Sequence, residues 1–254
     1  MTAPAQPKRP SAKPAIDEDE LLASHITPLI STVAFAARAI SRCVTRIRIE
    51  GAIDEIPRVG PVILAANHVS NADPVVIGAW LTPRLGRRIH WLGKREMFDW
   101  PIVGWMARTG GVVPVDRGAA DAEAFRMARR VLDAGHVLMV FPEGTRSATG
   151  ELQQPKDGLA MLALRTGATI VPIAVSDSDR VWPRGQLIPK PGGRITMRVG
   201  KPFRLEDELP AGMDRKSAKA AATEVIMRRI AAELSPRQRG VYGNPASDSG
   251  DARP

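Results

Sequence analysis

A histidine and an aspartate, His68 and Asp73, stand five residues apart at the junction of two apolar segments. The run 61–66 before them has the length and composition of a buried strand, and Pro74 opens a stretch with helical apolar spacing after them. Histidine titrates near neutral pH, so its imidazole can take a proton from a hydroxyl group when a strand end holds it in a cleft. This arrangement is suited to general-base chemistry on an alcohol.

The spacing of the two residues predicts that they span a corner of the chain. Residues five apart on a regular helix point about 140° away from each other, so His68 and Asp73 would not meet on one helix. Asp is a favoured helix N-cap and Pro74 suits the first helical position, which places a helix start at Asp73. Its carboxylate can then accept the second imidazole N–H. The alternative, that Asp73 only caps and His68 is an ordinary loop residue, is not excluded by this spacing alone.

Three further segments follow in order: Gly-Val-Val-Pro-Val-Asp-Arg at 111–117, Phe-Pro-Glu-Gly-Thr-Arg-Ser at 141–147 and Val-Pro-Ile-Ala at 171–174. With Asn67, His68 and Asp73 they resemble the four ordered motifs of the glycerolipid acyltransferases, whose best-known bacterial members are the 1-acylglycerol-3-phosphate acyltransferases. Four motifs in order are far more specific than any one of them.

The resemblance implies a fatty acyl transfer. The donor would be an acyl thioester, either acyl-CoA or an acyl carrier protein, and the acceptor the free hydroxyl of 1-acylglycerol-3-phosphate, which becomes phosphatidate. His68 is then the general base, Asp73 orients it, and no cofactor is expected. The alternatives are an acyltransferase for another lysophospholipid or a glycolipid, and a non-catalytic module that binds lipid or acyl-CoA.

The resemblance also implies a polar acceptor pocket. Arg117 would bind the acceptor phosphate, the alternative being an ion pair with a neighbouring aspartate. Glu143 would accept from a glycerol hydroxyl and Arg146 would pair with phosphate, unless the two only tie a turn together as an ion pair. Gly144 lets the backbone approach a ligand closely. The remaining residues expected to bind substrate are Asn67, Thr145 and Lys156.

Strand-like and helix-like segments alternate along most of the chain, which predicts an α/β fold with a mostly parallel or mixed sheet flanked by helices. Strands are expected at 46–50, as an edge strand, and at 61–66, 89–92, 112–115, 136–141, 169–176 and 195–199, and helices at 121–134, 159–164 and 213–234. Ligands of such sheets gather at the carboxyl ends of the strands, where the motifs stand. Pro172 within a strand predicts a sheet edge or a bulge.

The chain is expected to divide into four parts, a disordered arm at 1–20, an amphipathic helix at 21–48, the acyltransferase domain at 49–235 and a disordered tail at 236–254. The longest uncharged run of the helix, 26–37, is too short to span a bilayer, which takes about 20 residues. Arginines at 38, 42 and 46 suit contact with anionic headgroups. The alternative is a helix packed on the main domain.

The net charge of +9 indicates an anionic partner, and both an anionic membrane surface and the phosphates of acyl-CoA fit. Nucleic acid is not expected, because only 4% of the residues are aromatic and no nucleic-acid-binding motif occurs. The four histidines lack metal-ligand spacing, so no metal is expected. The single Cys43 and the absence of a secretion signal favour a peripheral protein on the cytoplasmic face of the cell membrane.

Overall fold

The computed structural model describes residues 25–100, 104–105, 107–108, 110–115, 120–156 and 158–243. Its strands are β1 (Arg46–Gly51), β2 (Val62–Ala66), β3 (Ile89–Lys94), β4 (Val112–Val115), β5 (Val137–Val140), β6 (Thr169–Ser176) and β7 (Arg194–Val199). They form one seven-stranded sheet in the order β1-β7-β6-β2-β5-β3-β4. Neighbours from β6 to β4 run parallel, whereas β7 is antiparallel to β6 and β1 is parallel to β7. The expected α/β fold with a mixed sheet is confirmed.

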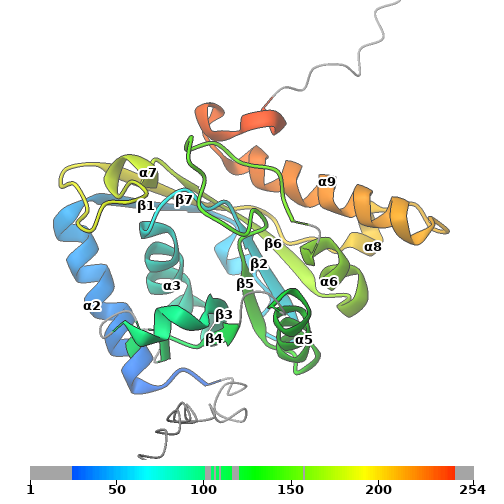
Figure 1. Ribbon diagram of the computed structural model, residues 1–254, viewed down its shortest axis with the longest axis horizontal. Helices are drawn as coiled ribbons and strands as arrows, with labels where there is room; N and C mark the ends of the chain where they lie inside the picture. The colour runs from blue at the N-terminus through cyan, green and yellow to red at the C-terminus, as the bar shows by residue number, and fades with distance from the viewer. Residues whose placement is uncertain are drawn as a thin grey trace, which may run out of the picture.

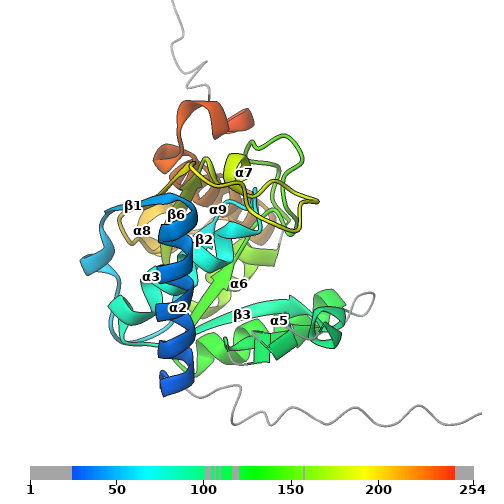
Figure 2. The same ribbon diagram turned by 90° about the vertical axis from the view of Figure 1, so that its left-hand side faces the viewer.

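Helices cover both faces of this sheet (Figures 1 and 2). One face carries α3 (Ala72–Leu85) and α7 (Ser178–Val181), and α2 (Pro28–Val44) packs on α3. The other face carries α5 (Ala120–Asp133), α6 (Gly158–Thr166) and α9 (Arg215–Glu233). The shorter helices are η1 (Ile53–Glu55), η2 (Arg95–Asp99), α8 (Leu205–Glu208), η3 (Pro236–Gln238) and η4 (Gly240–Tyr242).

The strand that precedes His68 is buried along its whole length. Ile63 and Ala65 of β2 join the apolar cluster under α5, α6 and α9, while Leu64 and its alternate neighbours join the cluster under α3. Burial of each large aliphatic side chain stabilises the fold by about 1.5–3 kcal/mol. The carboxyl end of β2 is therefore a rigid support for the residues that follow it.

Pro172 lies in an interior strand, because β6 stands between β2 and β7. The ladder is irregular beside it: Ile170 pairs with Phe203, whereas Ile173 pairs with Val199. Two residues of β6 therefore face three of the opposite segment, which is a bulge. Ile170 N donates to Phe203 O on that side, and alternation of the strand puts the missing donor of Pro172 on the same side. Of the two expected positions, the bulge is the one observed.

The N-terminal helix is shorter than the expected segment 21–48. It begins at Pro28, where Thr27 Oγ1 accepts a hydrogen bond from Ile30 N at 3.2 Å, and it ends before β1 starts at Arg46. Its buried face packs on α3, and the guanidinium of Arg42 lies 5.7 Å from the ring centroid of Trp80. No helix among the described residues is both long and apolar enough to cross a bilayer.

The first part of the expected tail at 236–254 is ordered, which corrects the prediction. Residues 236–243 contain η3 and η4, and Gln238 is fully buried. Its side chain accepts from Asp177 N at 2.9 Å and donates to Gly150 O at 3.2 Å, so it satisfies backbone groups of two distant loops. No local sequence pattern reveals such contacts. Residues 1–24 and 244–254, including the expected arm, lie outside the described residues.

Candidate active site

Three loops converge at the carboxyl edge of the sheet. His68 follows β2, Glu143 follows β5, and Ser178 begins α7 directly after β6. Because β5, β2 and β6 are adjacent and parallel, the loops that leave their carboxyl ends meet at one place. The first, third and fourth motifs of the sequence are thereby brought together.

His68 and Asp73 are in direct contact. His68 Nδ1 lies 2.9 Å from Asp73 Oδ2, and Asp73 is completely buried whereas the imidazole is 17% exposed. The imidazole also stacks on the ring of Phe141, with centroids 4.0 Å apart and an interplanar angle of 16°. With Nδ1 directed to the carboxylate, Nε2 on the other side of the ring is the atom that can take a proton. This geometry is that of a histidine base oriented by an acid.

Asp73 is the second residue of α3, and Asn71 occupies the N-cap position instead. The expected N-cap role of Asp73 is therefore corrected. Its Oδ2 accepts from Val69 N at 2.8 Å and from Ser70 N at 2.7 Å, two amides that precede the helix. A capping side chain would accept from amides of the first helical turn. The carboxylate thus holds the loop of His68 together as well as its ring.

Ser178 completes the environment of Asp73, and sequence analysis missed it. Its Oγ donates to Asp73 Oδ1 at 2.5 Å, and both side chains are fully buried. Each oxygen of the carboxylate therefore has a donor. The two residues are 105 positions apart, so the only local signal was a serine standing just after a strand that carries the fourth motif.

Glu143 holds the backbone of His68 rather than facing an open pocket. Its Oε1 accepts from His68 N at 2.7 Å and its Oε2 from Gln153 N at 3.0 Å, and the side chain is buried. Ser147 N donates to His68 O at 2.7 Å, so this loop binds both backbone groups of His68. Burial raises the pKa of Glu143 to about 7, against the lowering effect of its two backbone hydrogen bonds. The side chain thus makes a positioning contact with the backbone of His68, and the expected bond to a glycerol hydroxyl stays a prediction.

Asn67 has a structural place as well. It is fully buried, its Nδ2 donates to Val175 O at 3.1 Å, and its Oδ1 accepts from Val175 N at 2.8 Å. These bonds join the carboxyl ends of β2 and β6. Both polar atoms of its amide thus bond backbone groups, and the expected substrate contact of Asn67 stays a prediction.

Arg146 lies beside the histidine loop. Its Nη1 donates to Asn71 Oδ1, three residues after His68, and its carbonyl accepts from Arg184 Nη1 at 3.2 Å. The ion pair between Glu143 and Arg146, one of the expected alternatives, is not what the structure shows, since each side chain has a different partner. Arg146 therefore remains a cation close to the histidine.

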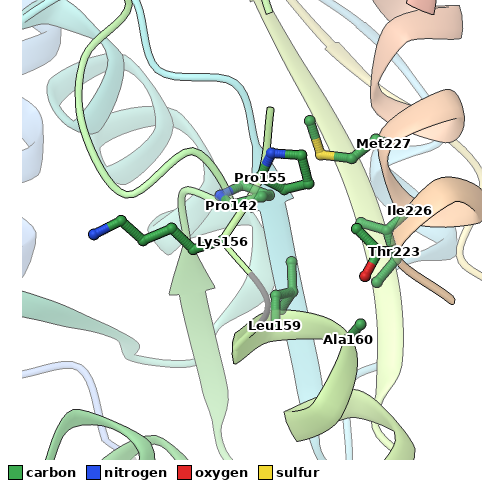
Figure 3. Close-up of a pocket in the computed structure, with 8 residues that line it drawn as sticks. All are labelled: Pro142, Pro155, Lys156, Leu159, Ala160, Thr223, Ile226 and Met227. Carbon is green, nitrogen blue, oxygen red and sulfur yellow. The ribbon is translucent and has the colours of Figure 1, made fainter. Parts of the chain in front are cut away.

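Gly144, Thr145 and Lys156 form the outer part of this loop. Thr145 and Lys156 are exposed, and Lys156 N donates to Pro142 O at 2.9 Å. Gly144 has φ +68°, and a Cβ there would lie 2.8 Å from Lys156 Cδ, so the lysine stem crosses the glycine closely. Figure 3 shows a small hollow between α6 and α9, with the Lys156 ammonium pointing away from it. Arg117, the remaining expected phosphate ligand, lies outside the described residues.

Known proteins resemble this chain over much of its length. A model of the acyltransferase family matches residues 46–176. A lyso-ornithine lipid O-acyltransferase of Pseudomonas aeruginosa is 27% identical over 239 residues, covering 87% of this chain and 86% of that protein. A 1-acyl-sn-glycerol-3-phosphate acyltransferase of the same organism is 26% identical over 206 residues, covering 80% of this chain and 76% of that protein.

A solved structure is similar over most of its length. The 1-acyl-sn-glycerophosphate acyltransferase PlsC from Thermotoga maritima is 25% identical, with a TM-score of 0.60, and the match covers 79% of this chain and 78% of that one. The family model includes β2, β5 and β6, the three strands whose carboxyl ends carry His68, Glu143 and the approach to Ser178. Because that model spans more than half of the sequence, the chain belongs to the acyltransferase family.

Proposed function

We propose that the chain transfers a fatty acyl group from an acyl thioester to the free hydroxyl of 1-acylglycerol-3-phosphate, giving phosphatidate. The observation that carries this proposal is the contact of His68 Nδ1 with the buried Asp73 carboxylate at the carboxyl edge of the sheet. The donor is acyl-CoA or an acyl carrier protein. The net charge of +9 supports work at an anionic membrane, which we place at the cytoplasmic face of the cell membrane.

The proposed reaction needs one proton shuttle. His68 Nε2 takes the proton of the acceptor hydroxyl while its oxygen attacks the thioester carbonyl carbon. The tetrahedral oxyanion then collapses, the carbon–sulfur bond breaks, and the imidazolium returns the proton to the leaving thiolate. Asp73 stabilises the imidazolium, and base catalysis of this kind contributes about a hundredfold to ten-thousandfold in rate. Arg146 and Lys156 supply cations for the phosphate of the acceptor.

A lyso-ornithine lipid is the second candidate acceptor. The match to the lyso-ornithine lipid O-acyltransferase favours it, because that match covers 87% of this chain and 86% of that protein. The acceptor hydroxyl would attack the thioester in the same way. The lipid product would differ, and the role of His68 would be the same. The two candidates differ in headgroup, since one presents a phosphate dianion and the other an amino-acid carboxylate and ammonium.

The test is an acyl-transfer assay with purified protein. Acyl-CoA and acyl carrier protein thioesters are each combined with 1-acylglycerol-3-phosphate, lyso-ornithine lipid and a neutral lysoglycolipid, and both thiol release and product mass are measured. Turnover with 1-acylglycerol-3-phosphate that disappears in His68→Ala and persists in His25→Ala is expected, because His25 is an exposed residue before α2. Turnover confined to lyso-ornithine lipid would select the second candidate. Failure to release thiol with any acceptor would contradict the proposal.

A further inference from the structure

The loop between α7 and β7, residues 182–193, exposes two adjacent aliphatic side chains. Leu187 is 92% exposed and Ile188 is 77% exposed. Isolated exposed aliphatic residues are common on soluble proteins and need no explanation. Three further properties of this loop indicate that the pair contacts a partner surface. They are its fixed backbone, its charge, and the two elements to which it is bonded.

The backbone of the loop is fixed on both sides of the pair. Trp182 Nε1 donates to Gln186 O at 2.9 Å, directly before the pair, and Lys190 N donates to Val181 O at 2.7 Å, two residues after it. The loop is therefore closed at its base, and the two side chains project from a hydrogen-bonded turn instead of packing on the domain. An apolar pair held in water in this way favours a partner surface.

The charge around the pair is of one sign. The segment 182–194 contains three cationic residues, Arg184, Lys190 and Arg194, all of them exposed, and no acidic residue. Apolar side chains that project between cations are typical of elements that enter the headgroup region of an anionic bilayer.

The base of the loop is continuous with α2. Gly192 N donates to Val44 O at 2.8 Å and Arg46 N donates to Gly193 O at 3.0 Å, so the loop lies beside the carboxyl end of that helix, as Figures 1 and 2 show. α2 itself leaves Phe35 and Ile40 about two-thirds exposed, at 67% and 65%. Apolar side chains of the helix and of the loop thus stand on neighbouring elements.

The same loop is bonded to the candidate active site. Ser70 Oγ, two residues after His68, donates to Trp182 O at 2.7 Å. Arg184 Nη1 donates to Arg146 O at 3.2 Å. A surface that receives the loop is consequently brought next to the histidine.

We propose that the Leu187–Ile188 tip and the exposed face of α2 together form a docking surface for an anionic lipid bilayer, with Arg184 and Lys190 at the headgroups. This deepens the proposed function, on which it rests, by naming the surface through which a lipid acceptor reaches His68. Insertion of the aliphatic pair supplies apolar burial, and the cations supply a salt-sensitive attraction.

The test compares binding to vesicles of phosphatidylglycerol and phosphatidylcholine with binding to phosphatidylcholine alone, by co-sedimentation. Leu187→Ser/Ile188→Ser is expected to weaken binding to the anionic vesicles by about tenfold or more, because two aliphatic side chains no longer insert. Phe35→Ser should weaken it in the same direction. Val59→Ser is the matched control and should bind as the wild type does. Val59 is 82% exposed on the loop that enters the amino end of β2, whereas His68 follows the carboxyl end of that strand. Thermal unfolding of each variant confirms the fold.

Vesicle binding tests the docking surface independently of acyl transfer. Equal vesicle binding by the double variant and the wild type would overturn it. So would a wild type that ignores vesicles but binds the acidic acyl carrier protein through Leu187 and Ile188, because the surface would then serve a protein. Vesicle binding that depends on the pair, in a protein that shows no acyl transfer, would support the docking surface while contradicting the proposed function.

Discussion

Ser178 Oγ donates a hydrogen bond of 2.5 Å to Asp73 Oδ1, on the side of the carboxylate that faces away from His68. The aspartate is thus held by groups from two distant parts of the chain, the loop after β2 and the start of α7. A carboxylate fixed in this way cannot rotate, so it holds the imidazole of His68 in one orientation. The position of His68 therefore depends on a residue that never touches it.

Ser178→Ala tests that dependence. Loss of the hydroxyl leaves a buried carboxylate oxygen without its donor, which costs about 1–3 kcal/mol of stability. Because the Asp73 carboxylate is then less firmly oriented, kcat should fall by about tenfold. The KM for the acceptor should stay unchanged, because Ser178 acts through Asp73. Thr166→Ala removes a hydroxyl that bonds Leu162 O within α6, far from the site, and should leave kcat intact. Steady-state kinetics separate the two parameters, and an unchanged kcat in Ser178→Ala would remove the serine from the mechanism.

Asp73→Asn separates charge from shape. The amide oxygen can replace Oδ2 toward the two loop amides and the imidazole, and the Ser178 hydroxyl can rotate to accept from the amide nitrogen, so the variant should fold. It cannot stabilise an imidazolium by charge, and kcat should fall about a hundredfold to ten-thousandfold. The matched control is Asp214→Asn, because Asp214 is a true N-cap that accepts from Lys216 N and Ser217 N. Full activity in Asp73→Asn would make this carboxylate a structural group only.

The strands and the motifs were predictable because both are local. β2 is a continuous apolar run, and its five buried residues follow directly from that composition. The contact between His68 and Asp73 was also predictable, since the chain only has to turn once between them. Pro172 predicted an edge or a bulge for a local reason too, its missing N–H, and the bulge is what is observed.

The partners of the motif residues could not be predicted in this way. A motif places Asn67 and Glu143 at the site, but it does not say that their side chains face backbone amides of β6 and of the histidine loop. Those bonds, like the contacts of Ser178 and Gln238, depend on how distant segments pack. Sequence reasoning therefore placed the motif residues next to one another but did not reveal which backbone groups their side chains bind.

Glu143 predicts a specific dependence of stability on pH. Its pKa rises from 4.5 to about 7 in the fold, mainly because burial disfavours the charged form. The folded state then holds a proton that the unfolded state has lost, so this contribution is fully present below pH 4.5 and declines until it is gone above about pH 7. It amounts to about 3 kcal/mol.

Urea unfolding of the wild type and of Glu143→Gln from pH 5 to pH 8 measures this contribution. The variant cannot ionise at this position, so the difference in the free energy of unfolding should shrink as pH rises, by a few kcal/mol at most. Subtraction removes the groups that the two proteins share. A difference that stays constant over this range would show that Glu143 is ionised throughout.

Gly144→Ala tests the close passage of the Lys156 stem over the third motif. Gly144 has φ +68° and Gly167 has φ +59°, so an alanine at either place pays a similar backbone penalty of about 1 kcal/mol. Only at position 144 does the new Cβ meet another side chain, because Lys156 Cδ lies 2.8 Å away, whereas nothing lies within 4 Å of the corresponding point at Gly167.

The lysine is exposed and flexible, so it moves aside and the two variants should unfold at similar temperatures. Displacement of its ammonium removes a cation from the proposed phosphate site, and KM for 1-acylglycerol-3-phosphate should rise severalfold in Gly144→Ala and stay unchanged in Gly167→Ala. Lys156→Ala should raise KM by a similar factor. Adding Gly144→Ala to that variant should then change KM very little, since the two substitutions act on one ammonium group. Additive increases in KM in the double variant would show instead that the glycine backbone contacts the acceptor independently of the lysine.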